Sequence, residues 1–172
     1  MLDGVLPGEA FYADRVEMTL GRVRIERSGA RFVPAVAEQV TGVIHLTFAD
    51  VATFLRQPEF LRTIMAGIDV VARLDLALAN DADGGLRITG AVEILGSRFP
   101  ISTSAGLRID DGKLVVSAAS LEGVPFLGAL QVQPFDLVLP LRSPPGMAFT
   151  GVSTAPGEVL LEFAGTDFEL RR

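Results

Sequence analysis

Apolar and polar residues alternate through most of this chain, and this alternation limits its possible folds more than any other feature. From residue 68 to residue 78, for example, the apolar residues at every second position are Ile68, Val70, Ala72, Leu74, Leu76 and Leu78. A period of two places such side chains on one face of a β-strand. The mean hydropathy is positive, at +0.41, yet prolines interrupt the longest uncharged stretch, residues 143–157. A membrane-spanning helix needs roughly 20 consecutive apolar residues, so the hydrophobicity predicts sheets with one apolar face.

The alternation predicts strands, and short breaks in it predict turns and helices. We expect strands over residues 15–27, 40–46, 68–78, 86–94, 99–109, 114–121, 135–141, 147–154 and 158–170. Asp50 follows Thr47 by three residues, which is close to a capping box and predicts the start of a helix. A second short helix is expected from Pro58 to Gly67, and a loop or short helix over residues 123–134. The apolar phase slips at Gly21, which indicates a bulge or a bend.

These elements predict the fold class. A chain of 172 residues fits one domain, residues 1–172. We predict a mainly β fold with a few short helices, in which an elongated antiparallel sheet curls, or closes into a barrel, around an apolar interior. Gly42, Gly90 and Gly151 fall on the apolar phase. We interpret them as positions that let the sheet coil; the alternative is that they leave room for a ligand.

The residue types that usually perform catalysis are scarce. The chain has no cysteine and one histidine, His45, so we predict neither a metal site nor a catalytic residue. His45 lies on the phase opposite to Ile44 and Leu46. We interpret it as a polar-face histidine that faces solvent or a neighbouring strand, with a catalytic role as the alternative. The formal net charge is −6, and without a basic patch we expect no nucleic-acid partner.

One group of basic residues lies on the first long predicted strand. Arg22, Arg24 and Arg27 are close together there. We interpret them as part of a solvated strand face, and contact with anionic lipid head groups is the alternative.

Two stretches resemble a known family. Residues 40–50, VTGVIHLTFAD, are similar to the strand-then-helix signature of the LmeA-like family, a phospholipid-binding family of the bacterial cell envelope. Residues 134–170 resemble its C-terminal part, with a strand ending at Leu139-Pro140, a Pro144-Pro145-Gly146 turn, and a closing segment at residues 165–170. The resemblance implies an elongated barrel-like β fold around a hydrophobic cavity for acyl chains.

The same resemblance bears on location. Members of the family usually carry an export or anchoring segment ahead of the first strand. The N-terminus here has neither the basic region nor the apolar region of a signal peptide. We therefore expect the cell envelope or periplasm if an export segment is missing from this sequence, and the cytoplasm otherwise.

Together these observations predict non-catalytic binding of a phospholipid or another fatty-acyl lipid, in lipid carriage or in support of cell-envelope assembly. We expect no cofactor. We do expect peripheral contact with a membrane. The residues expected to line the cavity are Ile44, Leu46, Val70, Leu74, Ile88, Gly90, Val92, Phe99, Ile101 and Leu139. We expect Gly90→Leu to fold and to lose lipid, because its side chain would project into the interior.

Two alternatives remain open. One is a structural β domain with a filled core that acts through protein partners. The other is an enzyme on envelope lipid or glycan. Filled and hollow barrels share the same alternation, so the pattern does not separate the first alternative from lipid binding.

Overall fold

The computed structural model describes residues 4–6, 9–11, 13–28, 30–56, 71–94, 96–118, 135–140, 143 and 146–170. Its strands are β1 (Gly4–Leu6), β2 (Glu9–Phe11), β3 (Arg15–Ser28), β4 (Arg31–Thr47), β5 (Val71–Asn80), β6 (Leu86–Ile94), β7 (Ser97–Asp110), β8 (Lys113–Ala118), β9 (Phe135–Pro140), β10 (Met147–Ala155) and β11 (Glu158–Glu169). Its helix is α1 (Phe48–Leu55). The second predicted helix, at residues 58–67, and the segment 123–134 lie outside these residues.

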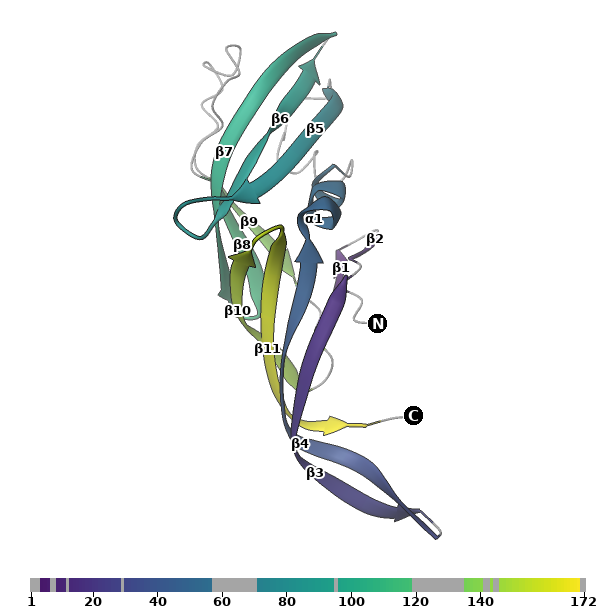
Figure 1. Ribbon diagram of the computed structural model, residues 1–172. Coiled ribbons are helices and arrows are strands. Elements are labelled where there is room, and N and C mark those ends of the chain that lie inside the picture. The colour runs from purple at the N-terminus through teal and green to yellow at the C-terminus, as the bar shows by residue number, and fades with distance from the viewer. Residues whose placement is uncertain are drawn as a thin grey trace.

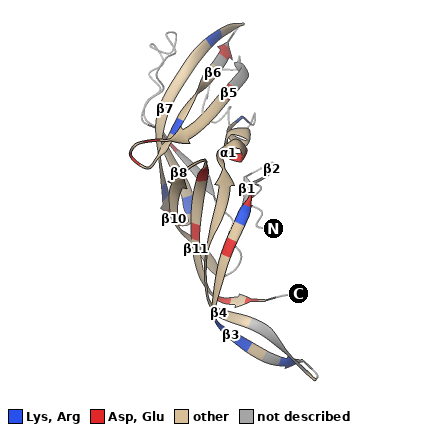
Figure 2. Cartoon of the chain, viewed as in Figure 1, with Lys and Arg blue, Asp and Glu red and all other residues tan. Residues whose placement is uncertain are grey.

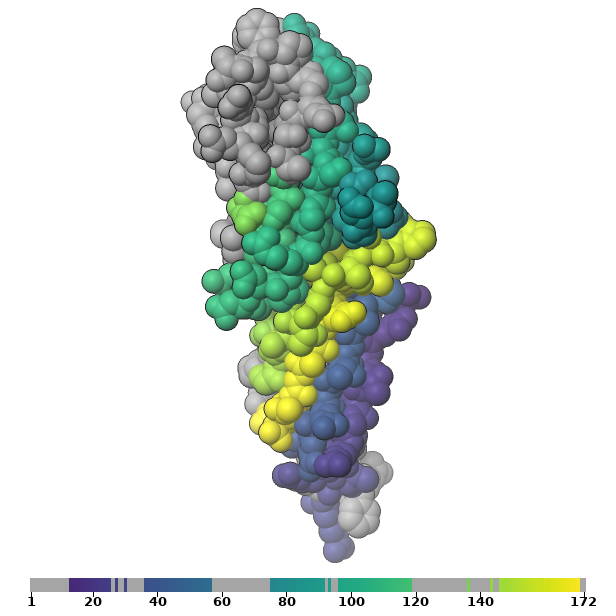
Figure 3. All heavy atoms as spheres, turned by 90° about the vertical axis from the view of Figure 1, so that its left-hand side faces the viewer, coloured from purple at the N-terminus to yellow at the C-terminus, as the bar shows by residue number. Residues whose placement is uncertain are grey.

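The long strands form two antiparallel sheets. The smaller sheet has the order β10-β11-β4-β3, the larger has the order β5-β6-β7-β8-β9, and β1 pairs with β2 in a separate two-stranded ribbon. Both sheets twist strongly, and together they give the molecule an elongated outline (Figure 1, Figure 3). Each order has two end strands, so each sheet is open over the described strands. The predicted mainly β fold is confirmed, in its curled-sheet form.

Helix α1 lies where the two sheets meet (Figure 1). Its first residue, Phe48, donates its backbone N–H to Gly157 O at 2.8 Å, in the turn between β10 and β11. At its other end Arg56 donates from its guanidinium to Leu76 O on β5 at 2.6 Å. Phe54 and Leu55 are buried between these contacts. The helix therefore ties the smaller sheet to the larger one.

The start of α1 follows from its sequence. Thr47 is the N-cap, and its hydroxyl accepts the Asp50 N–H at 3.2 Å while donating to the Asp50 carboxylate. This exchange satisfies a backbone donor that the first helical turn leaves without a partner. The helix predicted from the Thr47–Asp50 spacing is confirmed.

The two sheets also meet at a pair of turns. The side chain of Asn80 donates to Ala155 O at 3.0 Å, and the hydroxyl of Thr154 donates to Gly84 O at 3.1 Å. Asn80 ends β5 and Gly84 lies in the turn that leads to β6, whereas Thr154 and Ala155 end β10. These bonds hold the tip of one hairpin against the tip of another.

The bend predicted at Gly21 lies one residue further along. Arg22 has a φ of 50°, and the register of β3 with β4 shifts between Arg24 and Ile25. On the other side of β4, Asp167 of β11 has a φ of 53°. Positive φ is uncommon for residues with a side chain. We therefore attribute the bend to the coiling of β3, β4 and β11, which run side by side at this level. The ribbon turns sharply there (Figure 1).

Strand β4 is longer than predicted. It begins at Arg31 rather than at residue 40, because residues 31–36 pair with the far end of β3. The hairpin predicted at Asp111-Gly112 is confirmed, with φ values of 49° and 68°. Positive φ at both central residues is what a tight two-residue turn between twisted strands requires.

Candidate functional site

The register of the larger sheet brings its apolar positions into common rows. Successive rows across β5, β6 and β7 are Leu74–Val92–Phe99, Leu76–Gly90–Ile101 and Leu78–Ile88–Thr103. Further along the same sheet, Leu114 of β8 pairs with Leu139 of β9. Seven of the ten residues predicted to bind lipid occupy these rows. These seven positions, which the alternation assigned to the apolar faces of separate strands, therefore lie on one sheet.

Two predicted residues belong to the smaller sheet. Ile44 pairs with Leu161, and Leu46 pairs with Val159. All four are buried in one core cluster, which also includes Phe54 of α1. Val70 lies outside the described residues. The apolar faces of the two sheets thus contribute to one core cluster, to which α1 adds Phe54 and Leu55.

Burial divides the predicted residues into two groups. Ile44 and Leu46 are 5% and 6% exposed, so protein atoms already cover them. Ile88, Phe99 and Ile101 are only half-buried, and Ile88 and Ile101 pack against the margin of the core cluster. The half-buried group lies on β6 and β7, where side chains keep surface for a further apolar partner.

Gly90 has a backbone role that the sequence did not reveal. A Cβ atom built there would collide with the carbonyl oxygen of Asp75 on β5. Glycine is the residue that permits such a close approach of two backbones. A side chain at position 90 would meet β5 before it reaches the interior, so Gly90→Leu must push β5 and β6 apart. Whether this variant folds stays a prediction. Whether lipid touches Gly90 stays a prediction.

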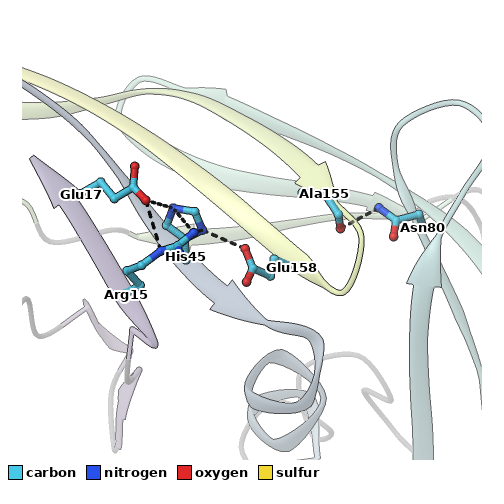
Figure 4. A network of polar contacts seen from close by, with 6 residues as sticks. All are labelled: Arg15, Glu17, His45, Asn80, Ala155 and Glu158. Atoms are coloured by element: carbon cyan, nitrogen blue, oxygen red, sulfur yellow. Dashed lines mark hydrogen bonds and ion pairs between the residues drawn. The ribbon is translucent and has the colours of Figure 1, made fainter.

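A polar cluster occupies the other face of the smaller sheet (Figure 4). His45 Nδ1 lies 2.8 Å from Glu158 Oε2. A guanidinium nitrogen of Arg15 lies 3.1 Å from Nδ1 and 3.4 Å from Nε2, and Glu17 Oε1 is 3.7 Å from Nε2. The His45 residue is 8% exposed. Of the two expected environments, solvent or a neighbouring strand, the structure has the second, with partners on β3 and β11.

The ring nitrogens of His45 have separate roles in this geometry. Nδ1 cannot donate to Glu158 and accept from Arg15 at once. Both partners are satisfied when Nδ1–H donates to Glu158 and the Nε2 lone pair accepts from Arg15. The cluster lies on the face of β4 opposite to Ile44 and Leu46. A lipid held on the apolar face would be separated from it by the sheet.

Sequence reasoning did not find the partners of His45. Arg15 pairs with His45 in the register, and Glu158 lies diagonally from it, beside Thr47. One signal was available, because Arg15, Glu17 and His45 all occupy the polar phase of their strands. The pairing of β4 with β11 connects residues more than a hundred positions apart, and no local pattern encodes it.

A second polar cluster stands on the solvent face of the larger sheet. Arg108 donates to Ser117 Oγ at 2.6 Å and to Asp136 Oδ2 at 2.9 Å, and Ser117 donates to Asp136 Oδ1 at 2.6 Å. The hydrogen bond from Ser117, and then that from Arg108, hold the pKa of Asp136 below its usual value. These cross-strand contacts fix the pairing of β7, β8 and β9.

Over the described ranges, no three side chains of His, Cys, Asp or Glu gather closely enough to hold a metal ion. Among the same residues, no helix has the length and apolar character needed to cross a bilayer.

The sequence is similar to a known protein family. The family model described as LmeA-like phospholipid-binding matches residues 1–164. No curated protein and no solved structure matches the chain significantly.

Proposed function

Because the chain belongs to the LmeA-like phospholipid-binding family, we propose that it binds phospholipid without catalysis, with the acyl chains against the apolar face of β5, β6 and β7. One observation carries the proposal. Ile88, Phe99 and Ile101 occupy neighbouring rows on that sheet and remain half-buried. Each CH₂ group moved from water to an apolar surface contributes about 0.8 kcal/mol. Acyl burial on this face supplies the affinity, and no single polar residue is required.

The buried residues define where the lipid stops. Ile44 and Leu46 pack in the cluster that contains Phe54 of α1, so an acyl chain that approaches along β6 and β7 meets protein there. This observation also favours the filled-core alternative for the smaller sheet. In our proposal the smaller sheet is support, and the larger sheet is the binding surface.

Matched substitutions on β6 test the proposal. Ile88→Gln places an amide on the apolar face, whereas Thr89→Gln changes the next residue, which is exposed. An unpaired amide against acyl chains costs about 1–3 kcal/mol, so we expect Ile88→Gln to retain a fluorescent phospholipid about tenfold less well. Thr89→Gln should retain it like the wild type. Circular dichroism checks that both variants fold.

The purified wild-type and variant proteins also separate lipid binding from the two alternatives, a filled core and an enzyme. Phospholipid extracted from the purified protein and identified by mass spectrometry supports binding. Protein that carries no lipid, with Ile88→Gln and wild type alike in the retention assay, would favour the filled core. Hydrolysed lipid in wild-type samples but not in His45→Ala samples would favour the enzyme.

The second part of the proposal is that the protein carries phospholipid and so supports assembly of the cell envelope. The likeness of residues 40–50 to the signature of the LmeA-like family suggests this role. It is measured as transfer of labelled phospholipid between donor and acceptor vesicles. A protein that retains lipid but does not speed transfer is a binder and not a carrier.

A further inference from the structure

The far end of the β3–β4 hairpin extends beyond the rest of the smaller sheet. Strand β11 pairs with β4 only as far as Val36, whereas β3 and β4 continue to the pair Ser28 and Arg31. We call residues 22–28 and 31–36, beyond the bend at Arg22, the distal hairpin. It forms the narrow end of the molecule, opposite to the end that carries β5, β6 and β7 (Figure 1, Figure 3).

The distal hairpin exposes apolar side chains. Val23 is 37% exposed and Ile25 is 61% exposed. They are two residues apart on β3, so they lie on the same face of the strand. A single exposed apolar residue needs no explanation, but two on one face of a projecting hairpin form a surface that can enter an apolar phase.

The same strand carries positive charge. Residues 22–27 contain three arginines and one glutamate, although the chain as a whole has a net charge of −6. Arg22, Arg24 and Arg27 are all exposed, and basic residues mark this part of β3 in Figure 2. Arg24 lies 3.5 Å from Glu38, in an ion pair exposed on both sides and hence weak. This segment is therefore complementary to an anionic surface.

We infer that the distal hairpin docks the protein on the surface of an anionic phospholipid bilayer. Val23 and Ile25 enter the boundary between head groups and acyl chains, with Arg27 on the same phase of the strand. Arg24 is on the opposite phase, and it reaches the phosphates, as Arg22 does, from the flank of the narrow two-stranded hairpin. The inference rests on the proposed function, because a phospholipid that leaves a bilayer through water would expose every CH₂ group of its chains. A protein that takes up such a lipid must meet the bilayer.

A second copy of the chain fits the distal hairpin less well. Pairing two copies along the edge of β3 would bring two rows of arginines together, and like charges opposite each other destabilise a sheet. An anionic bilayer instead brings opposite charge to the same side chains. The charge pattern thus favours a lipid surface.

Two double variants separate the apolar and the electrostatic contributions. Val23→Thr with Ile25→Thr keeps β-branched residues on the strand and removes the apolar surface. Arg24→Gln with Arg27→Gln removes two charges. The assay is flotation with phosphatidylcholine vesicles that contain about one-third phosphatidylglycerol. Because each arginine contributes about fivefold to binding at such a surface, the arginine variant should bind about 25-fold less.

The two variants should differ on neutral vesicles. On pure phosphatidylcholine the arginine variant should bind like the wild type, whereas the threonine variant should bind less on both compositions. The control for the apolar variant is Val16→Thr, which changes a residue of β3 that is 44% exposed. The control for the arginine variant is Arg98→Gln, which changes an exposed arginine of β7 that forms an ion pair with Asp75 of β5. Both should float like the wild type.

Lipid retention distinguishes this inference from the proposed function. Both double variants, loaded with fluorescent phospholipid from detergent, should retain it normally. If they also bind the anionic vesicles normally, docking by this hairpin is refuted while lipid binding stands. If the wild type floats through Val23 and Ile25 but retains no lipid, the proposed function fails and docking stands. A wild-type dimer that Val23→Thr with Ile25→Thr abolishes, with flotation unchanged, would assign the surface to a second copy and overturn docking.

Discussion

His45 Nδ1 and Glu158 Oε2 lie 2.8 Å apart although their residues are 113 positions apart in the sequence. The contact crosses from β4 to β11, and Arg15 adds β3 to the same cluster. Three of the four strands of the smaller sheet are thus joined by side chains on its polar face. Because His45 is buried, the loss of its partner would leave a polar ring inside the protein, which is costly.

We predict that His45→Ala lowers the free energy of unfolding by roughly 1–3 kcal/mol and leaves lipid retention unchanged. The stability loss follows from the lost bonds to Glu158 and Arg15, and the unchanged retention follows from the face on which the cluster lies. Urea unfolding measures the first quantity. In a cycle with Glu158→Gln, we expect a coupling of about 0.5–1 kcal/mol, because Glu158 is partly exposed. Additive effects of the two substitutions would show that the contact contributes nothing.

The cap of α1 makes a second prediction. Thr47→Ala removes the hydroxyl that accepts the Asp50 N–H and should cost about 1 kcal/mol of stability. Thr53→Ala is the matched control, because its hydroxyl bonds back to Ala49 O within the helix, a contact that contributes little. It should be neutral or slightly stabilising. Equal losses in the two variants, measured by thermal unfolding, would contradict a capping role for Thr47.

Two serines should control the titration of two different aspartates. The hydrogen bond from Ser117 is the main cause of the lowered pKa of Asp136, and that from Ser104 is the main cause of the lowered pKa of Asp81. Ser117→Ala should therefore raise the pKa of Asp136 and leave that of Asp81 unchanged. Ser104→Ala should do the reverse. Carboxyl carbon shifts followed by NMR during an acid titration measure both groups in each variant.

The sign of the pH dependence follows from the same shifts. A carboxyl with a lowered folded-state pKa stabilises the fold above its unfolded pKa of about 4, and this contribution is lost as the pH falls through the folded value. In acid below pH 4, Ser117→Ala and Ser104→Ala should each lose less stability than the wild type does. A steeper acid loss in either variant would contradict the role of its serine.

The strands and α1 could be predicted because their signals are local. Alternation over ten residues indicates a strand, and the three-residue spacing of Thr47 and Asp50 indicates a helix start. The bend could be placed only to within one residue. Gly21 is the flexible residue, but Arg22 takes the positive φ, because the coiling of β3, β4 and β11 determines where the backbone turns.

For the candidate site, the sequence could predict only which residues lie on the apolar face of each strand. Alternation placed Ile44 and Ile88 among apolar positions alike, but Ile44 is buried in the core cluster whereas Ile88 is half-buried. That difference depends on how the two sheets and α1 pack together, and no local pattern in the sequence encodes this packing. The cluster around His45 was out of reach for the same reason, since it depends on the pairing of distant strands.

The close approach of β5 and β6 gives the last prediction. At Gly90 a Cβ would collide with the carbonyl of Asp75, whereas at Gly106, in β7 of the same sheet, the nearest heavy atom to a built Cβ is Ser117 O at 4.0 Å. Gly90→Ala must therefore separate two paired backbones and should lower the free energy of unfolding by about 1–3 kcal/mol. Gly106→Ala makes only an ordinary van der Waals contact and should raise the free energy of unfolding by up to about 1 kcal/mol, because alanine restricts the unfolded chain. Urea unfolding compares the two. If both alanines are tolerated equally, the glycine at position 90 does not serve the close approach, and the interpretation of Gly90 as room for lipid regains its force.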